Sequence, residues 1–522
     1  MSNRDSIARA AQHQGTLLAI GCGLLLVSNG RWILPIATWL APIPWLLFVE
    51  RAGHRATFGA AVLYAAVLFV SWQGLIPAPG AIYLAIILAY AAAYFVPYLV
   101  HRVLARHHVG LLWTLVFPVA SVAVEFLFQR FATPYGSWFS VAYTQVTDLA
   151  LLQVVSLVGT WGVTFLIAWG AAVAAYFARR ALMDDSLRAT TREMGRHSWT
   201  TPRFRGSRTP IIAFAVAMLA TCGYGELRIW PTQNSAPLVR VAALVPTPRL
   251  AQDVDRYFSP RLTPSAPTWD SLRAAAAVLN ADLFERSRRE AQSGARIIAW
   301  SETAARLLKQ DEPDFLARAS ALAVSERVQL FVAYGTFTPG NPHPLENAVA
   351  AIDSTGRLAW VFHKAHPIVG PESPLVASGD AKLRTLLLPL GRVSAAICHD
   401  MDFPTLIRQA GLRDVTLLVN PAADWPDITE MHSNMARVRA IENGFTMVRP
   451  ASGGRSLVTS DRGETLAQLD SPTDALVAIV RPRAVATLYA QIGDAFAWAC
   501  VLLLIVASAL ALQRPGTGAP TV

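Results

Sequence analysis

The sequence predicts a helical membrane bundle joined to one layered α/β domain. Of its 522 residues, 53% are hydrophobic and only 15% carry a charge, and the mean hydropathy is +0.37. The apolar residues form long runs before residue 230 and one more near the end of the chain. From Val239 onward, short apolar stretches alternate with amphipathic ones, as in layered domains of strands and helices. Together these features are typical of a polytopic membrane protein that carries a large extramembrane domain.

Eight apolar runs are long enough to be expected as membrane spans. They cover residues 12–28, 33–49, 57–76, 81–100, 109–128, 149–177, 210–227 and 495–512. The first resembles a signal peptide in length, but no small-residue cleavage site followed by an extramembrane region appears, so we expect it to be retained. The predicted domains are a seven-span bundle at 1–230, an α/β domain at 231–490, and a last span with a short tail at 491–522.

Arginine placement predicts the orientation, because short cytoplasmic loops collect basic residues. With a cytoplasmic N-terminus, fourteen arginines fall inside, and only Arg31 and Arg130 fall in short outside loops. The fourteen are Arg4, Arg9, Arg51, Arg55, Arg102, Arg106, Arg179, Arg180, Arg188, Arg192, Arg196, Arg203, Arg205 and Arg208. The α/β domain is then periplasmic or extracellular, and both termini are cytoplasmic. The net charge of +10 follows mostly from this topology, although the basic segment 179–209 leaves nucleic acid or anionic lipid open as an alternative.

The α/β domain alternates expected strands and helices. Strands are expected at 239–245, 295–301, 329–337, 347–353, 356–363, 415–420, 446–451, 455–460 and 475–481, and helices at 269–292, 313–327, 404–412 and 428–443. The apolar run from Val393 to Ile397 reads as a further buried strand. Three of the expected strands each end at a different reactive residue. These residues are Glu302, Lys364 and Cys398.

A free cysteine is often only a small buried hydrophobe, so Cys398 is not by itself a sign of catalysis. However, Cys22, Cys222 and Cys500 lie in expected spans, so Cys398 is the lone thiol of the exported domain and has no disulfide partner there. A neighbouring cation lowers the pKa of a thiol, and a carboxylate accepts its proton and returns it to a leaving group. We therefore expect Cys398 as nucleophile, Glu302 as base and acid, and Lys364 with the His399 backbone N–H at the oxyanion.

Four segments in order resemble the nitrilase, or carbon-nitrogen hydrolase, superfamily. They are the Ile-Ile-Ala-Trp-Ser-Glu302 strand end, the His-Lys364-Ala-His segment, the Ala-Ile-Cys398-His-Asp segment, and residues 435–443 with the sequence Met-Ala-Arg-Val-Arg-Ala-Ile-Glu-Asn. The resemblance covers roughly 238–483 and implies an αββα sandwich with a Glu-Lys-Cys triad. It also implies that Glu372 matches a second glutamate of such enzymes, although a solvated loop glutamate is the alternative.

The whole chain is similar to the apolipoprotein N-acyltransferase family, which places seven spans before such a domain and one after it. The segment Thr133-Pro-Tyr-Gly-Ser-Trp138 and the run at 157–165 also look like that family. The resemblance implies an enzyme of the bacterial inner membrane. Its acyl donor is a phospholipid, its intermediate is a thioester on Cys398, and its acceptor is the amine of a diacylglyceryl apolipoprotein.

The chain departs from that family's pattern beside the nucleophile, where Cys398-His399-Asp400 stands in place of Cys-Tyr-Glu. A membrane-anchored amidase, or an acyltransferase that uses another lipid or amine, is therefore an alternative, and a non-catalytic scaffold or transporter is a third. For Arg437, Arg439 and Glu442 we expect structural ion pairing rather than chemistry. Glu125 lies within an apolar span. Its side chain is expected either to face the interior of the bundle or to reach the outer membrane interface, and the sequence does not choose between the two positions.

No cofactor or metal is predicted. The histidines lack the H-E-x-x-H spacing of a zinc site, no C-x-x-C pair is present, and no glycine-rich nucleotide motif appears. The resemblance implies a phospholipid, an apolipoprotein and membrane lipid as partners, and no nucleic acid is expected.

Overall fold

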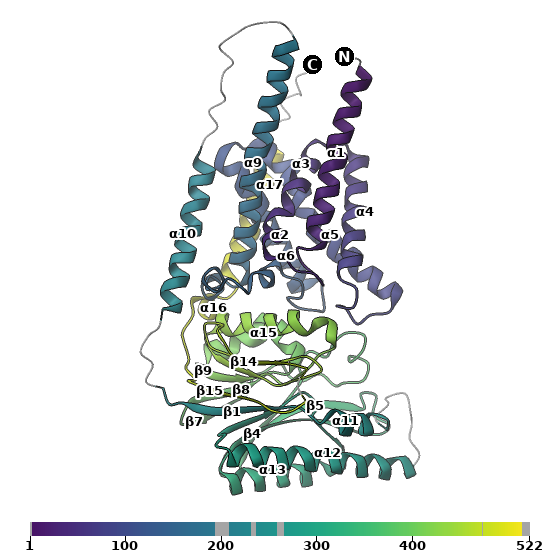
Figure 1. Cartoon of the computed structure of the whole chain (residues 1–522), viewed down its shortest axis with the longest axis vertical. Coiled ribbons are helices and arrows are strands. Elements are labelled where there is room, and N and C mark those ends of the chain that lie inside the picture. The colour runs from purple at the N-terminus through teal and green to yellow at the C-terminus, as the bar shows by residue number, and fades with distance from the viewer. Residues whose placement is uncertain (1–2, 194–207, 231–235, 258–265, 472, 514–522) are drawn as a thin grey trace.

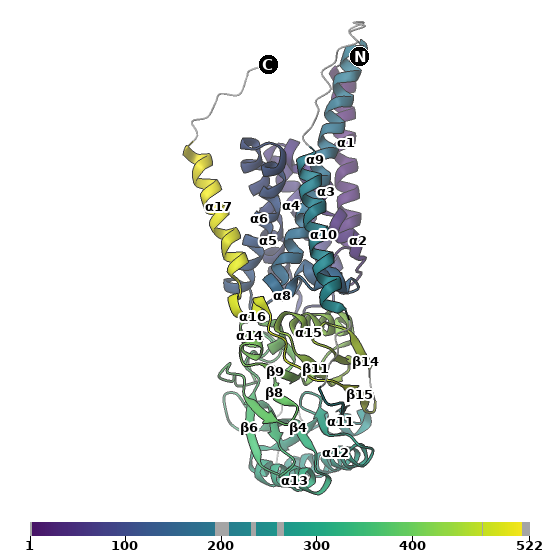
Figure 2. The same ribbon diagram turned by 90° about the vertical axis from the view of Figure 1, so that its left-hand side faces the viewer.

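The computed structural model describes residues 3–193, 208–230, 236–257, 266–471 and 473–513. A helix bundle and an α/β domain are stacked along its long axis (Figure 1). The start of α1 (Asn3–Leu26) and the end of α17 (Ala495–Gln513) both lie at the end of the bundle that is far from the α/β domain (Figure 2). The expected domain boundary at 230/231 and much of the basic segment 179–209 lie outside the described residues.

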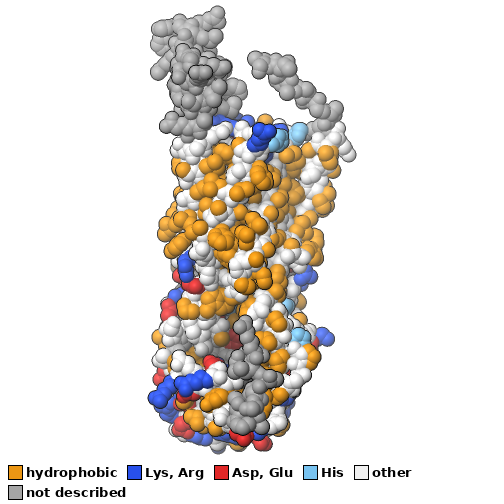
Figure 3. Space-filling view, turned by 90° about the vertical axis from the view of Figure 1, so that its right-hand side faces the viewer, with side chains coloured by type: hydrophobic (Ala, Val, Ile, Leu, Met, Phe, Trp, Pro, Cys, Tyr) orange, Lys and Arg blue, Asp and Glu red, His pale blue; other side chains and the backbone are white. Residues whose placement is uncertain are grey.

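The bundle is built from apolar helices. After α1 come α2 (Pro35–Leu40), α3 (Pro42–Arg51), α4 (His54–Ser71), α5 (Gly80–Leu104), α6 (Gly110–Phe131), α7 (Leu149–Leu152), α8 (Val155–Val158), α9 (Thr160–Glu193) and α10 (Thr209–Ile229). Within the described residues, six helices are long and apolar enough to cross a membrane: α4, α5, α6, α9, α10 and α17. Hydrophobic side chains cover the bundle, whereas charged ones gather on the α/β domain and at the far end of the bundle (Figure 3). The chain is therefore a membrane protein.

Two of the expected spans are not single long helices. Residues 33–49 form the two short helices α2 and α3, because Pro42 and Pro44 have no N–H to bond the carbonyls one turn earlier. Residues 149–177 begin with the short α7 and α8, and Gly159, with φ of +69°, separates these from α9. The apolar part of the first expected span is also short, at Gln14–Leu26. The count of eight spans therefore stays a prediction.

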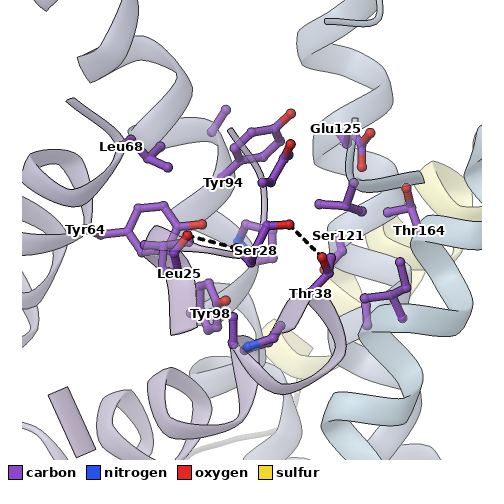
Figure 4. Close-up of a pocket in the computed structure, with 18 of the residues that line it drawn as sticks. Leu25, Ser28, Thr38, Tyr64, Leu68, Tyr94, Tyr98, Ser121, Glu125 and Thr164 are labelled. Atoms are coloured by element: carbon purple, nitrogen blue, oxygen red, sulfur yellow. Dashed lines mark hydrogen bonds between the residues drawn. The ribbon is translucent and has the colours of Figure 1, made fainter. Parts of the chain in front are cut away.

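Glu125 of α6 faces the interior of the bundle. Its side chain is buried and accepts a hydrogen bond of 3.0 Å from Nε2 of Gln129. It lines a cavity of about 90 Å³ together with Ser121, Tyr94 and Thr164, as Figure 4 shows. The alternative position at the outer interface is thus excluded for this glutamate.

The α/β domain is a sandwich of two sheets. In the first sheet the strand order is β15 (Leu476–Val480), β1 (Val239–Leu244), β2 (Ile297–Trp300), β4 (Gln329–Phe337), β5 (Leu345–Ile352) and β6 (Leu358–His363), with β3 (Ala305–Leu308) also beside β4. In the second it is β14 (Thr465–Asp470), β13 (Arg455–Thr459), β11 (Thr446–Arg449), β9 (Val415–Val419), β8 (Gly391–Ala395) and β7 (Thr385–Leu388). A short ladder joins β10 (Ala422–Ala423) to β12 (Ala451–Ser452).

Alternating side chains give the sandwich its layers. Val241 and Ile297 of the first sheet meet Val393 and Leu417 of the second in one buried core. The other face of the first sheet packs on α12 (Ala266–Gln292) and α13 (Glu312–Glu326). Helices α14 (Pro404–Leu412) and α15 (Thr429–Asn443) lie on the bundle side of the second sheet (Figure 2). The expected αββα arrangement is confirmed.

Several elements were not expected from the sequence. They are the helix α11 (Pro248–Asp255) and the strands β3, β7, β10, β12 and β14. All five strands have six residues or fewer, and four of them lie at a sheet edge or outside both main sheets.

Candidate active site

Cys398 follows strand β8 at the start of a tight turn, the 3₁₀ helix η4 (Cys398–Asp402). Its φ of +48° lies in the left-handed region, which is strained for a residue with a side chain. Its backbone N–H donates to the carbonyl of Pro421 at 2.7 Å, and the residue is only 2% exposed. The turn therefore holds one thiol at the end of a buried strand, as a strand-to-helix turn does for other nucleophiles.

The strand directions explain how Glu302 and Lys364 reach the same place. β2 is parallel to β4, and β6 is antiparallel to β5, which is itself antiparallel to β4. The carboxyl ends of β2 and β6 therefore point the same way. Lys364 Nζ lies 2.8 Å from Oε1 of Glu302, and both side chains are buried.

Glu372 completes this group. Lys364 Nζ donates to both of its carboxylate oxygens, at 2.8 and 2.7 Å. Glu372 Oε2 also accepts from the backbone N–H of Ile368 at 2.7 Å, so the loop after Lys364 is closed on itself. Glu372 is thus bonded to the lysine and is not a solvated loop residue.

The charges in this group act on one another. Burial lowers the pKa of Lys364, but the charges of Glu302 and Glu372 overcome this and raise it well above its usual value. Burial and the charge of Glu302 raise the pKa of the Cys398 thiol well above its usual value, and Lys364 opposes them. At rest the site therefore holds an ammonium and a protonated thiol, and a base has to remove the thiol proton as the thiol attacks.

Two supporting residues were not anticipated by the sequence analysis. Asn347 of β5 donates from Nδ2 to Oε1 of Glu302 at 2.7 Å. Asp400 accepts from the backbone N–H groups of Ala365 and His366, at 3.1 and 2.8 Å, and so ties the turn of the thiol to the loop of the lysine. Asp400 lies two residues after the cysteine in the Cys-His-Asp segment, which is the signal that could have found it.

The expected ion pair on α15 is present. Arg439 Nη1 lies 2.5 Å from Oε2 of Glu442, and both side chains are fully buried. Their other contacts reach the membrane bundle, because Arg439 donates to Tyr143 Oη at 2.6 Å and Glu442 accepts from the N–H of Thr160 at 3.0 Å. The pair therefore lies where the two parts of the molecule meet, and not inside the sandwich.

A second buried cluster lies behind the thiol. Ligating atoms of Cys398, Asp424 and His432 lie within 4.8 Å of one another. However, Arg449 Nη2 bonds both oxygens of Asp424 at 3.0 Å and lies 3.0 Å from His432 Nδ1. A guanidinium thus already supplies the positive charge there, and this donor set does not favour a metal ion.

Comparisons with known proteins agree on both parts of the chain. A family model described as "Apolipoprotein N-acyltransferase N-terminal domain" matches residues 22–173, and one described as "Carbon-nitrogen hydrolase" matches residues 266–490. A protein named apolipoprotein N-acyltransferase from Geobacter metallireducens is 26% identical, over 98% of this chain and 98% of its own. One of the same name from Rhodopseudomonas palustris is 26% identical, over 73% of this chain and 70% of its own.

Among solved structures, an amidase from Nesterenkonia sp. is similar with a TM-score of 0.38 and 18% identity, over 51% of this chain and 97% of its own. The membrane bundle and the sandwich each match a family model, and relatives of one name align with most of the sequence. The chain therefore belongs to the apolipoprotein N-acyltransferase family, a membrane-embedded branch of the carbon-nitrogen hydrolase superfamily.

Proposed function

We propose that this protein moves a fatty acyl chain from a phospholipid to the N-terminal amine of a diacylglyceryl apolipoprotein, through a thioester on Cys398. The observation that carries the proposal is the buried group of Glu302, Lys364 and Cys398 on three strand ends. The names of its relatives support the substrates. The attached bundle of apolar helices supports lipid as a substrate, because a water-soluble amide would need no membrane anchor.

In the first half-reaction the Cys398 sulfur attacks the ester carbonyl carbon, and Glu302 accepts the thiol proton. The carbonyl oxygen becomes an oxyanion, which the Lys364 ammonium and the backbone N–H of His399 stabilise. The carbon–oxygen bond to glycerol then breaks, and the glycerol oxygen takes the proton from Glu302. The products are a thioester on Cys398 and a lysophospholipid.

In the second half-reaction the neutral amine of the apolipoprotein attacks the thioester carbon. Glu302 accepts a proton from the amine nitrogen, and Lys364 again faces the oxyanion. The carbon–sulfur bond breaks, and the sulfur receives the proton held by Glu302. An amide is released and the site returns to its starting state. Glu372 would keep Lys364 in place during both halves through its two hydrogen bonds.

We also propose the domain assignment and orientation that go with this reaction. Residues 1–230 and 491–522 belong to the membrane part, and 231–490 form the catalytic domain on the periplasmic side of the bacterial inner membrane, with both termini cytoplasmic. The excess of arginine in the expected inside loops supports this orientation. The ends of α1 and α17 at the far side of the bundle are consistent with it.

The test is the intact mass of the purified protein after incubation with a phospholipid. We expect a mass increase of one acyl group that hydroxylamine removes. The adduct should map to the peptide that contains Cys398 and be absent from Cys398→Ser. The matched control is Cys500→Ser, which removes another buried cysteine, in α17, and should acylate normally.

Acylation of the Cys398→Ser protein, or no adduct with any phospholipid, would contradict the proposal. Hydrolysis of small amides by the same preparation without acylation would instead favour the membrane-anchored amidase. Addition of a diacylglyceryl peptide to the acylated protein tests the second half, and the peptide should gain the acyl mass as Cys398 loses it.

A further inference from the structure

The turn that carries Cys398 is bonded directly to a loop of the membrane bundle. This docking loop, residues 132–140, follows α6. The N–H and the hydroxyl of Ser137 both donate to the carbonyl oxygen of Asp402, at 2.8 and 2.9 Å. Trp138 Nε1 donates to Oδ2 of the same residue at 2.6 Å. Gly136, with φ of +57°, lies so close that a Cβ there would be 2.3 Å from the Asp402 carbonyl oxygen.

Asp402 connects the docking loop to residues that lie close to the thiol. Its Oδ2 also accepts from Nδ1 of His399 at 2.8 Å and lies 3.2 Å from Nε2 of His432. Nδ1 of His432 lies 2.7 Å from Asp424, which is the carboxylate beside Cys398. Each ring nitrogen of His432 thus lies within ion-pair distance of a carboxylate, and these two negative charges stabilise the positively charged form of the ring.

The charges of this network balance. Asp402 and Asp424 contribute two negative charges, and His432 and Arg449 contribute two positive ones, all on buried side chains. Burial lowers the pKa of His432, but the charges of Asp402 and Asp424 overcome this and raise it to about 9. The charge of Asp424 is among those that raise the pKa of Cys398, so the cations beside it limit that effect.

We propose that Trp138, Asp402 and His432 are positioning residues that make the docking loop of the membrane bundle part of the active site. The loop holds Asp402. Asp402 then fixes the turn of Cys398 and the orientation of His399, and His432 neutralises Asp424 beside the thiol. Because Cys398 has a strained backbone, an external clamp of this kind is what keeps its turn in one conformation.

This inference rests on the proposed role of Cys398 as nucleophile, but its test does not require acyl transfer. The measurement is the rate at which iodoacetamide alkylates Cys398 in the full-length protein in detergent, followed by peptide mass at a series of pH values. Wild-type protein that alkylates but never acylates would refute the proposed function and leave this test intact.

Trp138→Phe removes only the indole N–H that reaches Asp402. We expect alkylation of Cys398 to slow about tenfold, which corresponds to the loss of one strong hydrogen bond to a charged group. The matched control is Trp161→Phe, because Trp161 Nε1 also donates to a carboxylate at the domain junction, Oδ1 of Asp494 at 2.9 Å. The control should stay within about twofold of wild type.

Asp402→Asn should slow alkylation at least as much, and adding Trp138→Phe to it should have no further effect, because the indole acts through that carboxylate. Full additivity of the two changes would overturn the proposal.

His432→Gln tests the electrostatic part. The glutamine keeps polar atoms near both carboxylates but loses the charge, so Asp424 is left with only Arg449. We expect the pH of half-maximal alkylation to rise by about one unit. The charged or titratable groups around His432 are Asp402 and His399 of the turn, Asp424, Arg449 and the thiol itself.

An unchanged pH midpoint in His432→Gln, or wild-type alkylation in Trp138→Phe, would overturn the inference. Thermal melting of every variant separates misfolding from mispositioning. If His432→Gln does not fold, the comparison of Trp138→Phe with Trp161→Phe still tests the inference. Equal rates of Cys398 alkylation in these two variants would contradict the inference.

Discussion

At the scale of single residues, the ammonium group of Lys364 is bonded to two carboxylates. Lys364 bonds both Glu302 and Glu372, so the group has one negative charge in excess before the thiol is counted. That excess and the burial of Cys398 keep the thiol protonated at rest, which protects it from oxidation and leaves Glu302 to remove the proton. In the proposed reaction Glu302 thus both raises the pKa of the thiol and accepts its proton.

This double role predicts opposite effects of Glu302→Gln in two assays. The acyl-enzyme should form at least about 100-fold more slowly, because the base is lost. Alkylation of Cys398 should move to lower pH, because a negative charge beside the thiol is gone. Acyl-enzyme mass and alkylation rate against pH are the two measurements.

The control for Glu302→Gln is Glu346→Gln, which also removes a carboxylate bonded to a lysine, Lys309, but away from the thiol. It should change neither quantity. An alkylation profile of Glu302→Gln that stays in place or moves to higher pH would show that the charge of Glu302 does not act on Cys398.

At the scale of elements, helix α15 joins the catalytic sheet to the bundle. It contributes His432 to the network behind the thiol, and Arg439 and Glu442 to contacts with the bundle. The helix ends at Gly444, which has φ of +70° and lies so close to the next segment that a Cβ would be 1.9 Å from the carbonyl oxygen of Val485. Only glycine fits both the conformation and the contact.

Gly444→Ala should therefore destabilise the protein by roughly 2–4 kcal/mol, which combines backbone strain with overpacking. The matched control is Gly340→Ala, which also has positive φ, at +75°, but has nothing within 4 Å of its Cβ. That change should cost only about 1 kcal/mol, from the backbone alone. Thermal melting in detergent compares them, and equal losses would mean that the contact with Val485 has no effect.

At the scale of the whole molecule, the bundle and the sandwich are joined by buried polar contacts as well as by chain connections. Trp138 and Asp402 form one of these contacts, and Glu442 and the N–H of Thr160 another. On the periphery, Gln153 Nε2 of the bundle donates to the carbonyl oxygen of Arg462 in the sandwich at 3.0 Å.

The proposed orientation predicts which cysteines a membrane-impermeant maleimide labels in spheroplasts. In a chain without Cys22, Cys222, Cys398 and Cys500, a cysteine at Val278 on the outer helix α12 should be labelled before lysis. One at Arg55, in an expected inside loop, should be labelled only after lysis. Both positions are exposed, so access to the solvent does not distinguish them. The reverse pattern would place the sandwich in the cytoplasm.

Much of the architecture could be predicted from local sequence, and so could the placement of three candidate site residues at strand ends. Strand β4 and helix α14 have the bounds expected from their apolar patterns, because each buries a continuous face. Glu302, Lys364 and Cys398 were identified because each directly follows an apolar strand. The strands β3, β7 and β14 were missed, since each is short and pairs with only one neighbour, and β14 has an exposed, largely polar sequence.

The sequence by itself determined the apolar helices, the layered domain and the reactive groups, because hydrophobic periodicity and strand ends are local features. Only the tertiary structure decided that Asn347 bonds Glu302 and Glu372 bonds Lys364, that Glu125 faces inward, and that Trp138 reaches Asp402 from 264 residues away. Contacts of this kind depend on how β-sheets and helices dock, and no local pattern specifies them. The proposed clamp on Cys398 is therefore a property of the assembled fold.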